Sequence, residues 1–179
     1  MSQKVLLNTK EVNIILHRLA CQLIEDHNDF SNTVLIGIQP RGGFLAHRIA
    51  KLLREDYKIK NVQLGNLDIT FYRDDFRRSD KTLEASTTEI DFIVEDKNVV
   101  FIDDVLYTGR SIRAALTAIQ SFGRPKEIEL LTLIDRRFSR HLPIQPNYRG
   151  RQVDAINAEK VVVNWVENHG EDSVYLKNK

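Results

Sequence analysis

Two short apolar runs, each followed by a glycine-containing turn and then by helical periodicity, constrain the fold of this chain more than any other feature. The first run is Thr33–Ile38, and its turn is Gln39–Gly43. The second run is Asn98–Ile102, and the helix after its turn is predicted over Ser111–Phe122. A third run follows at Ile128–Ile134. Strands that alternate with helices predict an α/β fold with parallel βαβ units, in which ligands bind beyond the carboxyl ends of the strands.

The remaining segments add a helix, a strand and a cap to this prediction. Helical periodicity runs over Asn8–Asp26, where Asn8 and Glu11 are spaced as a capping box. Broken alternation over Asn61–Tyr72 predicts a strand or one arm of a hairpin, interrupted near its glycine. The last third of the chain predicts a small cap with one late strand at Val161–Trp165.

Composition limits the classes of protein that remain. A chain of 179 residues has the size of one domain, so we expect a single domain over residues 1–179. The net charge of +1 means that any binding of nucleic acid must come from a local basic patch. The lone Cys21 excludes an internal disulfide and a cysteine-based zinc cluster. We expect a cytoplasmic protein, because no signal peptide or membrane span is evident.

The segment Val99–Ser111, VVFIDDVLYTGRS, carries the clearest chemistry. A buried strand delivers two adjacent acids, and Thr-Gly-Arg-Ser then opens a helix. The helix N-terminus presents unpaired N–H groups, and Gly109 lets the backbone approach a phosphate closely. The carboxylates of Asp103 and Asp104 suit a pair of vicinal hydroxyls, directly or through Mg²⁺. This pattern predicts a phosphorylated-ribose site; the alternative is an ordinary strand-to-helix turn capped by aspartates.

The same segment resembles the phosphoribosyl-pyrophosphate (PRPP) motif of type I phosphoribosyltransferases. Together with DITFYRDD at Asp68–Asp75 and Leu142-Pro143-Ile144, it resembles the PyrR family of pyrimidine operon regulators and uracil phosphoribosyltransferases. The resemblance implies a twisted, mostly parallel sheet flanked by helices, with a small C-terminal cap, or hood. It also implies Mg²⁺ and the reaction of uracil with PRPP to give UMP and pyrophosphate. A homodimer or a higher homo-oligomer is expected.

The resemblance also implies a set of site residues, carried over position by position. The implied catalytic residues are Asp103, Asp104, Arg41 and Arg73. The implied substrate-binding residues are Asp103, Asp104, Tyr107, Thr108, Gly109, Arg110, Ser111, Arg41, Gly42, Arg136 and Arg137. Among these, Asp103 and Asp104 would face the ribose hydroxyls and, directly or through water, the Mg²⁺ that accompanies PRPP. The Thr-Gly-Arg-Ser turn would hold the 5′-phosphate, and the segment after Asp135 would hold uracil.

Three further features bear on catalysis. Arg41 lies in the turn where this fold binds pyrophosphate, although Pro40 removes one backbone N–H from that turn. The polar, mixed-charge segment Arg73–Glu89 is a candidate lid that would exclude water from the reacting sugar. Tyr107 stands where purine phosphoribosyltransferases commonly carry an acid, which disfavours a purine substrate.

A regulatory role rests on one basic window. Between Asp135 and Asp154 there is no acid, whereas arginines are frequent. PyrR proteins bind the leader RNA of pyrimidine messages when UMP is abundant, and the residues assigned to such binding are His17, Arg18, Arg140, Arg149 and Arg151. The alternative is a cap whose arginines pair with nearby acids. Also open are an RNA-binding regulator with little catalytic activity and a phosphoribosyltransferase for another base.

Overall fold

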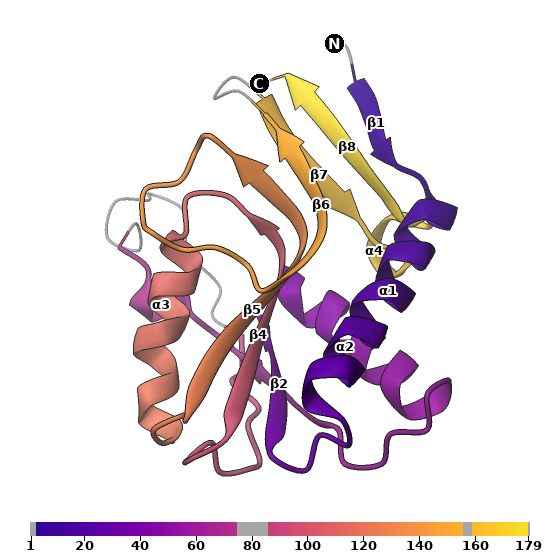
Figure 1. Ribbon diagram of the computed structural model, residues 1–179. Helices are drawn as coiled ribbons and strands as arrows, with labels where there is room; N and C mark the ends of the chain where they lie inside the picture. Colours follow the sequence, from indigo (N-terminus) through magenta and orange to yellow (C-terminus); the bar gives the residue numbers. More distant parts are fainter. Residues whose placement is uncertain (1–2, 75–85, 156–158, 179) are drawn as a thin grey trace.

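A five-stranded parallel sheet forms the centre of the molecule (Figure 1). The computed structural model describes residues 3–74, 86–155 and 159–178. The strand order is β3-β2-β4-β5-β6, and each neighbouring pair is parallel. The strand bounds are β2 Thr33–Ile38, β3 Gln63–Leu67, β4 Asn98–Leu106, β5 Glu127–Arg137 and β6 Tyr148–Asp154. The predicted α/β class is therefore confirmed.

Helices cover both faces of this sheet. The helices α1 (Thr9–His27) and α2 (Arg41–Glu55) pack together on one face, and α3 (Arg110–Ala118) covers the other (Figure 1). Two apolar clusters follow this division, because buried side chains of α1 and α2 belong to one and those of α3 to the other. Within the described ranges, no helix is long and apolar enough to cross a membrane.

The predicted cap is a second, antiparallel sheet at one end of the molecule (Figure 1). Its order is β1-β8-β7, with bounds β1 Gln3–Leu7, β7 Glu159–Asn164 and β8 Ser173–Asn178; the short helix α4 (Val166–His169) joins β7 to β8. We call this sheet with α4 the hood. The sequence predicted β7, but not that the N-terminal strand would complete the hood, since that pairing joins opposite ends of the chain.

Several local predictions need correction. The strand β6 was missed, because it is an edge strand in which exposed polar side chains replace an apolar run. The strand β3 runs through Gly65 without interruption, and a 3₁₀ helix, Thr70–Tyr72, follows it. The helix predicted to reach Phe122 ends as α at Ala118 and continues as a 3₁₀ turn, Ile119–Phe122. The capping box of α1 is confirmed, with both Asn8–Glu11 hydrogen bonds present.

Candidate active site

The turns that follow β2 and β4 meet at the carboxyl end of the sheet, because the two strands are parallel neighbours. Gly42, in the first turn of α2, makes this meeting possible. A Cβ atom there would lie 2.2 Å from the carbonyl oxygen of Ile102, so only glycine fits this close approach. The packing sets Arg41 beside the acid pair: its Nη1 lies 3.8 Å from Oδ2 of Asp104.

The acid pair lies inside the end of β4 rather than in a loop after it. Asp103 is half-buried and Asp104 is buried, and the backbone N–H of Asp104 donates to Oδ1 of Asp103 at 2.9 Å. Burial raises the pKa of Asp103 well above its usual range, and the neighbouring carboxylate of Asp104 raises it further. Burial also raises the pKa of Asp104, while the Arg41 guanidinium opposes that rise.

One oxygen of the pair is poised for a ligand. Among the described residues, no hydrogen-bond donor reaches Oδ2 of Asp104, although this atom is buried and such atoms normally have a partner. Carboxylate oxygens are the ligands that Mg²⁺ prefers. In the described ranges, no three His, Cys, Asp or Glu side chains gather to hold a metal ion. The pair therefore fits a cation that receives further ligands from a bound substrate.

The turn between β4 and α3 forms the second part of the site. Gly109 has φ 91°, in the left-handed region, and caps the N-terminus of α3. A cavity of about 250 Å³ lies over this turn, and it is lined by Arg73, Asp103, Val105, Leu106, Tyr107, Thr108, Gly109, Arg110, Ser111 and Ile112. The structure thus gathers one predicted acid, Arg73 and the whole Thr-Gly-Arg-Ser turn around one cavity. Arg41 and Gly42 lie beside the acids, outside this lining.

The beginning of the predicted lid contacts the turn of residues Thr108–Ser111, which we call the phosphate turn. Asp74 accepts hydrogen bonds from Arg110 and Arg113, both on α3. The hydrogen bond from Arg110 lowers the pKa of Asp74, and Arg113 contributes in the same direction. The guanidinium of Arg110, predicted to bind phosphate, is therefore paired with an acid here. Most of the predicted lid, residues 75–85, lies outside the described residues.

The two arginines assigned to uracil both line a larger cavity of about 950 Å³, but their side chains have different partners. Arg136 is buried, its guanidinium lies 4.0 Å from the ring centroid of Tyr107, and it donates to the carbonyl of Glu159 at 3.1 Å. It thus joins the active-site turn to the first residue of β7 in the hood. Arg137 instead pairs with Asp154 on β6.

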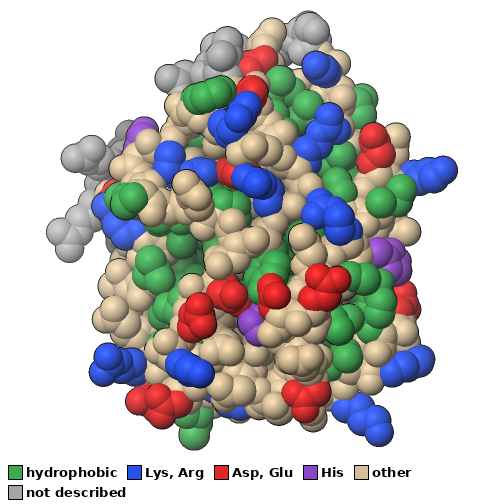
Figure 2. Space-filling model, in the orientation of Figure 1, with side chains coloured by type: hydrophobic (Ala, Val, Ile, Leu, Met, Phe, Trp, Pro, Cys, Tyr) green, Lys and Arg blue, Asp and Glu red, His purple; other side chains and the backbone are tan. Residues whose placement is uncertain are grey.

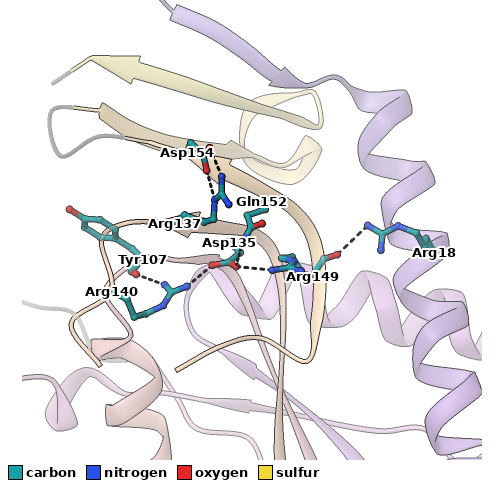
Figure 3. Close-up of polar contacts among 8 residues, drawn as sticks. All are labelled: Arg18, Tyr107, Asp135, Arg137, Arg140, Arg149, Gln152 and Asp154. Carbon is teal, nitrogen blue, oxygen red and sulfur yellow. Dashed lines mark hydrogen bonds and ion pairs between the residues drawn. The ribbon is translucent and has the colours of Figure 1, made fainter. Parts of the chain in front are cut away.

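The residues assigned to RNA form one connected group and two outlying members. Arg140 and Arg149 both donate to the buried Asp135 (Figure 3). Arg18, on α1, donates to the carbonyl oxygen of Arg149 at 3.2 Å (Figure 3). It also donates to the carbonyl oxygen of Gly150 at 2.6 Å. In contrast, Arg151 donates to the carbonyl of Leu6 at 2.6 Å, and His17 contacts the hydroxyl of Tyr57 at 3.2 Å.

Comparison with known proteins places this geometry in a family. The model of the phosphoribosyl transferase domain matches residues 2–168. A "Bifunctional protein PyrR" of Gloeothece citriformis is 45% identical over 96% of this chain and 95% of its own length. That of Limosilactobacillus fermentum is 42% identical over 92% of each chain. The chain belongs to the PyrR family. The activity of this family is phosphoribosyl transfer, and its substrates are PRPP and a nucleobase.

Solved structures agree with the PyrR-family assignment at the level of the fold. A hypoxanthine phosphoribosyltransferase of Staphylococcus aureus has a TM-score of 0.70 at 20% identity, covering 98% of this chain and 92% of the other. The Trypanosoma cruzi hypoxanthine phosphoribosyltransferase has a TM-score of 0.73 at 15% identity, covering 98% and 96%. The expected type I phosphoribosyltransferase fold is confirmed.

Two residues with roles at these PyrR-family sites were missed by the sequence reasoning. Asp135 anchors both Arg140 and Arg149, and Asp74 holds two arginines of α3. For Asp135 a signal existed, because an acid directly after a long apolar strand is buried and needs a partner. No comparable signal marked Asp74, whose partners lie 36 and 39 positions away in the sequence.

Proposed function

We propose that this protein is a uracil phosphoribosyltransferase of the PyrR type, which joins uracil to PRPP and releases pyrophosphate and UMP. The observation that carries this proposal is the pair Asp103–Asp104 directly beside the Thr108–Ser111 turn. The carboxylates can accept hydrogen bonds from two ribose hydroxyls, and the backbone N–H groups of the turn can donate to a phosphate. Both sets of groups lie at the end of β4, as the binding of a 5-phosphoribosyl group requires. We further propose that it works in the cytoplasm as a homodimer or a higher homo-oligomer.

The two aspartates would hold the ribose hydroxyls and, with PRPP, Mg²⁺, directly or through water. The buried Oδ2 of Asp104, without a donor among the described residues, supports this assignment. When bound, Mg²⁺ would neutralise part of the pyrophosphate charge. The side chains themselves orient the ribose, and the Thr108–Ser111 turn fixes its 5′-phosphate at the N-terminus of α3.

The leaving pyrophosphate would meet positive charge from two sides. Arg41 stands beside Asp104, and its side chain is half exposed, so it can turn toward an incoming anion. Gly42 lets that turn approach the end of β4, and Arg73 lines the cavity over the Thr108–Ser111 turn. Bond breaking at the anomeric carbon develops a cation-like sugar, so positioning and charge neutralisation supply the catalysis and no protein nucleophile is needed.

Uracil would bind between the active-site turn and the hood. The Tyr107–Arg136 stack, tied to the carbonyl of Glu159, supports this placement because it borders the turn on the hood side. Arg137 remains assigned to the same segment, although its side chain pairs with Asp154. Tyr107 offers no carboxylate for a purine ring proton, which favours a pyrimidine.

We also propose UMP-dependent binding of pyrimidine operon leader RNA. The relatives' name, "Bifunctional protein PyrR", supports a second activity beside catalysis. The connected group of Arg18, Arg140 and Arg149 supplies charge for such binding, with His17 and Arg151 as assigned outlying members. Phosphate contacts make RNA binding sensitive to salt.

One assay tests the enzymatic proposal: PRPP consumption at fixed Mg²⁺ with uracil, orotate, hypoxanthine and guanine in parallel. We expect UMP from uracil and little turnover with the other bases. Turnover with another base alone would replace uracil as the substrate. No turnover with any base, beside intact RNA binding, would favour the alternative of a regulator with little catalytic activity.

A further inference from the structure

We propose that the cavity beneath the loop of residues 138–147, which joins β5 to β6, binds one unpaired nucleotide of a single-stranded RNA. The base would stack on Phe138, and its phosphate would meet Arg149. This inference rests on the RNA-binding part of the proposed function and names the element of RNA that is recognised. The cavity, of about 950 Å³, is large enough for a nucleotide; its lining shares no residue with that of the cavity over the phosphate turn, and it includes Arg136 and Arg137, which are assigned to uracil.

Phe138 supplies the stacking surface. Its side chain is 81% exposed, an unusual position for a large aromatic residue, and it lines the cavity. The guanidinium of Arg137 lies 5.1 Å from its ring centroid. Leu142, Pro143 and Ile144 add apolar surface to the same cavity. An exposed ring beside an arginine is the arrangement on which proteins stack unpaired bases.

The charged groups around the cavity are fixed in place by Asp135. Its carboxylate accepts from Arg140 on one side and from Arg149 on the other, and from the amide of Gln152 at 3.4 Å (Figure 3). The Arg149 side chain remains 47% exposed, so its guanidinium can also donate to a phosphate. Lys and Arg side chains gather over the upper part of this face, while acidic side chains lie mainly below (Figure 2).

The concave shape selects an unpaired nucleotide rather than a duplex. A base within a helix is stacked on both faces and cannot lie against Phe138, whereas an unpaired base can enter the cavity. The shape and the ring add a contact that is independent of charge. The cavity should therefore prefer single-stranded RNA even though arginines alone would bind any polyanion.

The loop over this cavity also rests on the phosphate turn. The backbone N–H of His141 donates to the carbonyl of Thr108 at 3.0 Å, and Arg140 donates to that of Tyr107. Ile144 packs against Gly109, where an added Cβ would lie 3.2 Å from its Cδ1. A nucleotide phosphate that orders the turn would therefore order the loop, which provides a direct route from bound UMP to RNA affinity.

The test is fluorescence anisotropy of a labelled 12-nucleotide single-stranded RNA and of the same RNA annealed into a duplex, with saturating UMP. We expect the single strand to bind about tenfold more tightly. The substitution Phe138→Ala should weaken single-strand binding about tenfold and leave the salt slope unchanged, because it removes stacking and no charge. Phe138→Tyr keeps a stacking ring and should remain within about twofold of the wild type.

Two matched variants separate stacking from general effects. Ile93→Ala removes another exposed apolar side chain, 72% exposed and outside the cavity lining, and should not change RNA affinity. Arg149→Ala should weaken binding and reduce the salt slope by about one. Equal binding by the wild type and Phe138→Ala, or a preference for duplex, would overturn the proposal. Weakening of free UMP binding instead of RNA binding by Phe138→Ala would also overturn it.

These outcomes are distinguishable from failure of the enzymatic proposal. If the protein forms UMP from uracil and its RNA binding does not depend on Phe138, only this inference is contradicted. If RNA binding depends on Phe138 but no base is turned over, only the catalytic part of the proposed function is contradicted. A wild type that binds no RNA overturns both the inference and the regulatory part, while the assay of UMP formation stands separately.

Discussion

Two buried aspartates at the carboxyl end of the sheet, Asp104 next to the smaller cavity and Asp135 in the lining of the larger one, differ in their partners. Asp104, at the PRPP side, has a single ion pair in the described structure, with Arg41 at 3.8 Å. Asp135, at the larger cavity, accepts from Arg140, Arg149 and Gln152. A buried carboxylate with few hydrogen-bond partners, here called under-partnered, is unfavourable in the free protein, and a bound ligand can supply the missing partners. A carboxylate whose oxygens all have partners, here called saturated, holds the neighbouring side chains in place. The arrangement at Asp104 is therefore suited to binding a ligand, and the arrangement at Asp135 is suited to a structural role.

The largest expected effect is on catalysis by Asp103→Asn. We expect UMP formation to fall by about 10²–10³-fold, because a preorganised charge beside the reacting sugar is removed. The amide retains Oδ1 as an acceptor for the N–H of Asp104, so the turn should keep its geometry. Steady-state kinetics with uracil and PRPP measure the loss. An unchanged rate would contradict the assignment of this residue.

The second effect is on stability, and it separates the buried acid of the larger cavity from an exposed acid near it. Asp135→Ala should lower the free energy of unfolding by about 2–4 kcal/mol, because it leaves Arg140, only 21% exposed, without its buried partner. Asp154→Ala breaks the exposed pair with Arg137 and should cost about 0–1 kcal/mol. Urea denaturation of both variants makes the comparison. Similar losses from the two would remove the distinction between a scaffold acid and a surface acid.

The third effect is a pH dependence of stability at the PRPP side. The raised pKa of Asp103 means that the folded protein binds a proton more tightly than the unfolded chain. The free energy of unfolding therefore falls as the pH rises from the ordinary aspartate range through the raised pKa. Asp103→Asn should show less of this fall and be more stable than the wild type at neutral pH. A gain of about 1 kcal/mol corresponds to a Tm increase of about 2–4 °C.

Thermal unfolding of the wild type and Asp103→Asn from pH 4 to pH 8 checks this prediction. Parallel curves that differ by a constant offset would show that Asp103 does not titrate differently in the folded protein. If Asp103→Asn is less stable than the wild type at neutral pH, favourable interactions of the Asp103 carboxylate outweigh the cost of its burial. Either result would weaken the comparison between an under-partnered and a saturated acid.

The smallest expected effect concerns Asp74. In the structure this carboxylate pairs with Arg110 of the phosphate turn, so it competes with the 5′-phosphate for the same guanidinium. Asp74→Asn should lower the KM for PRPP by about two- to threefold, a small change because the pair is exposed and screened. The change should shrink at high salt. A higher KM would show instead that Asp74 positions Arg110 for binding.

Much of the PRPP side could be predicted because its parts are contiguous. Asp103, Asp104 and the Thr108–Ser111 turn occupy nine consecutive positions, and a strand followed by a helix holds such a segment in one known shape. Gly42 was assigned to the site by resemblance, and its close contact with the backbone of β4 explains why a glycine is needed there. The hood was predicted only in part, since β1 reaches it from the other end of the chain.

The larger cavity could not be predicted in the same way. The sequence shows a run of arginines without acids, but the charge of that run is set by Asp135 at its border and by Asp154 at its end. Arg136 and Arg137 are neighbours in the chain, yet one stacks on Tyr107 and the other pairs with β6. Side chains of adjacent strand residues point in opposite directions, so the two arginines have different partners although both line the larger cavity.

The sequence by itself determined the alternation of strands and helices, the acid pair, the phosphate turn and the family, because these depend on local periodicity and on contiguous motifs. Only the tertiary structure decided which acids are left under-partnered, which arginines are neutralised and which loop rests on the phosphate turn. These properties arise from contacts between residues far apart in the chain. The number and distance of such partners, rather than residue type, set the electrostatic character of each cavity.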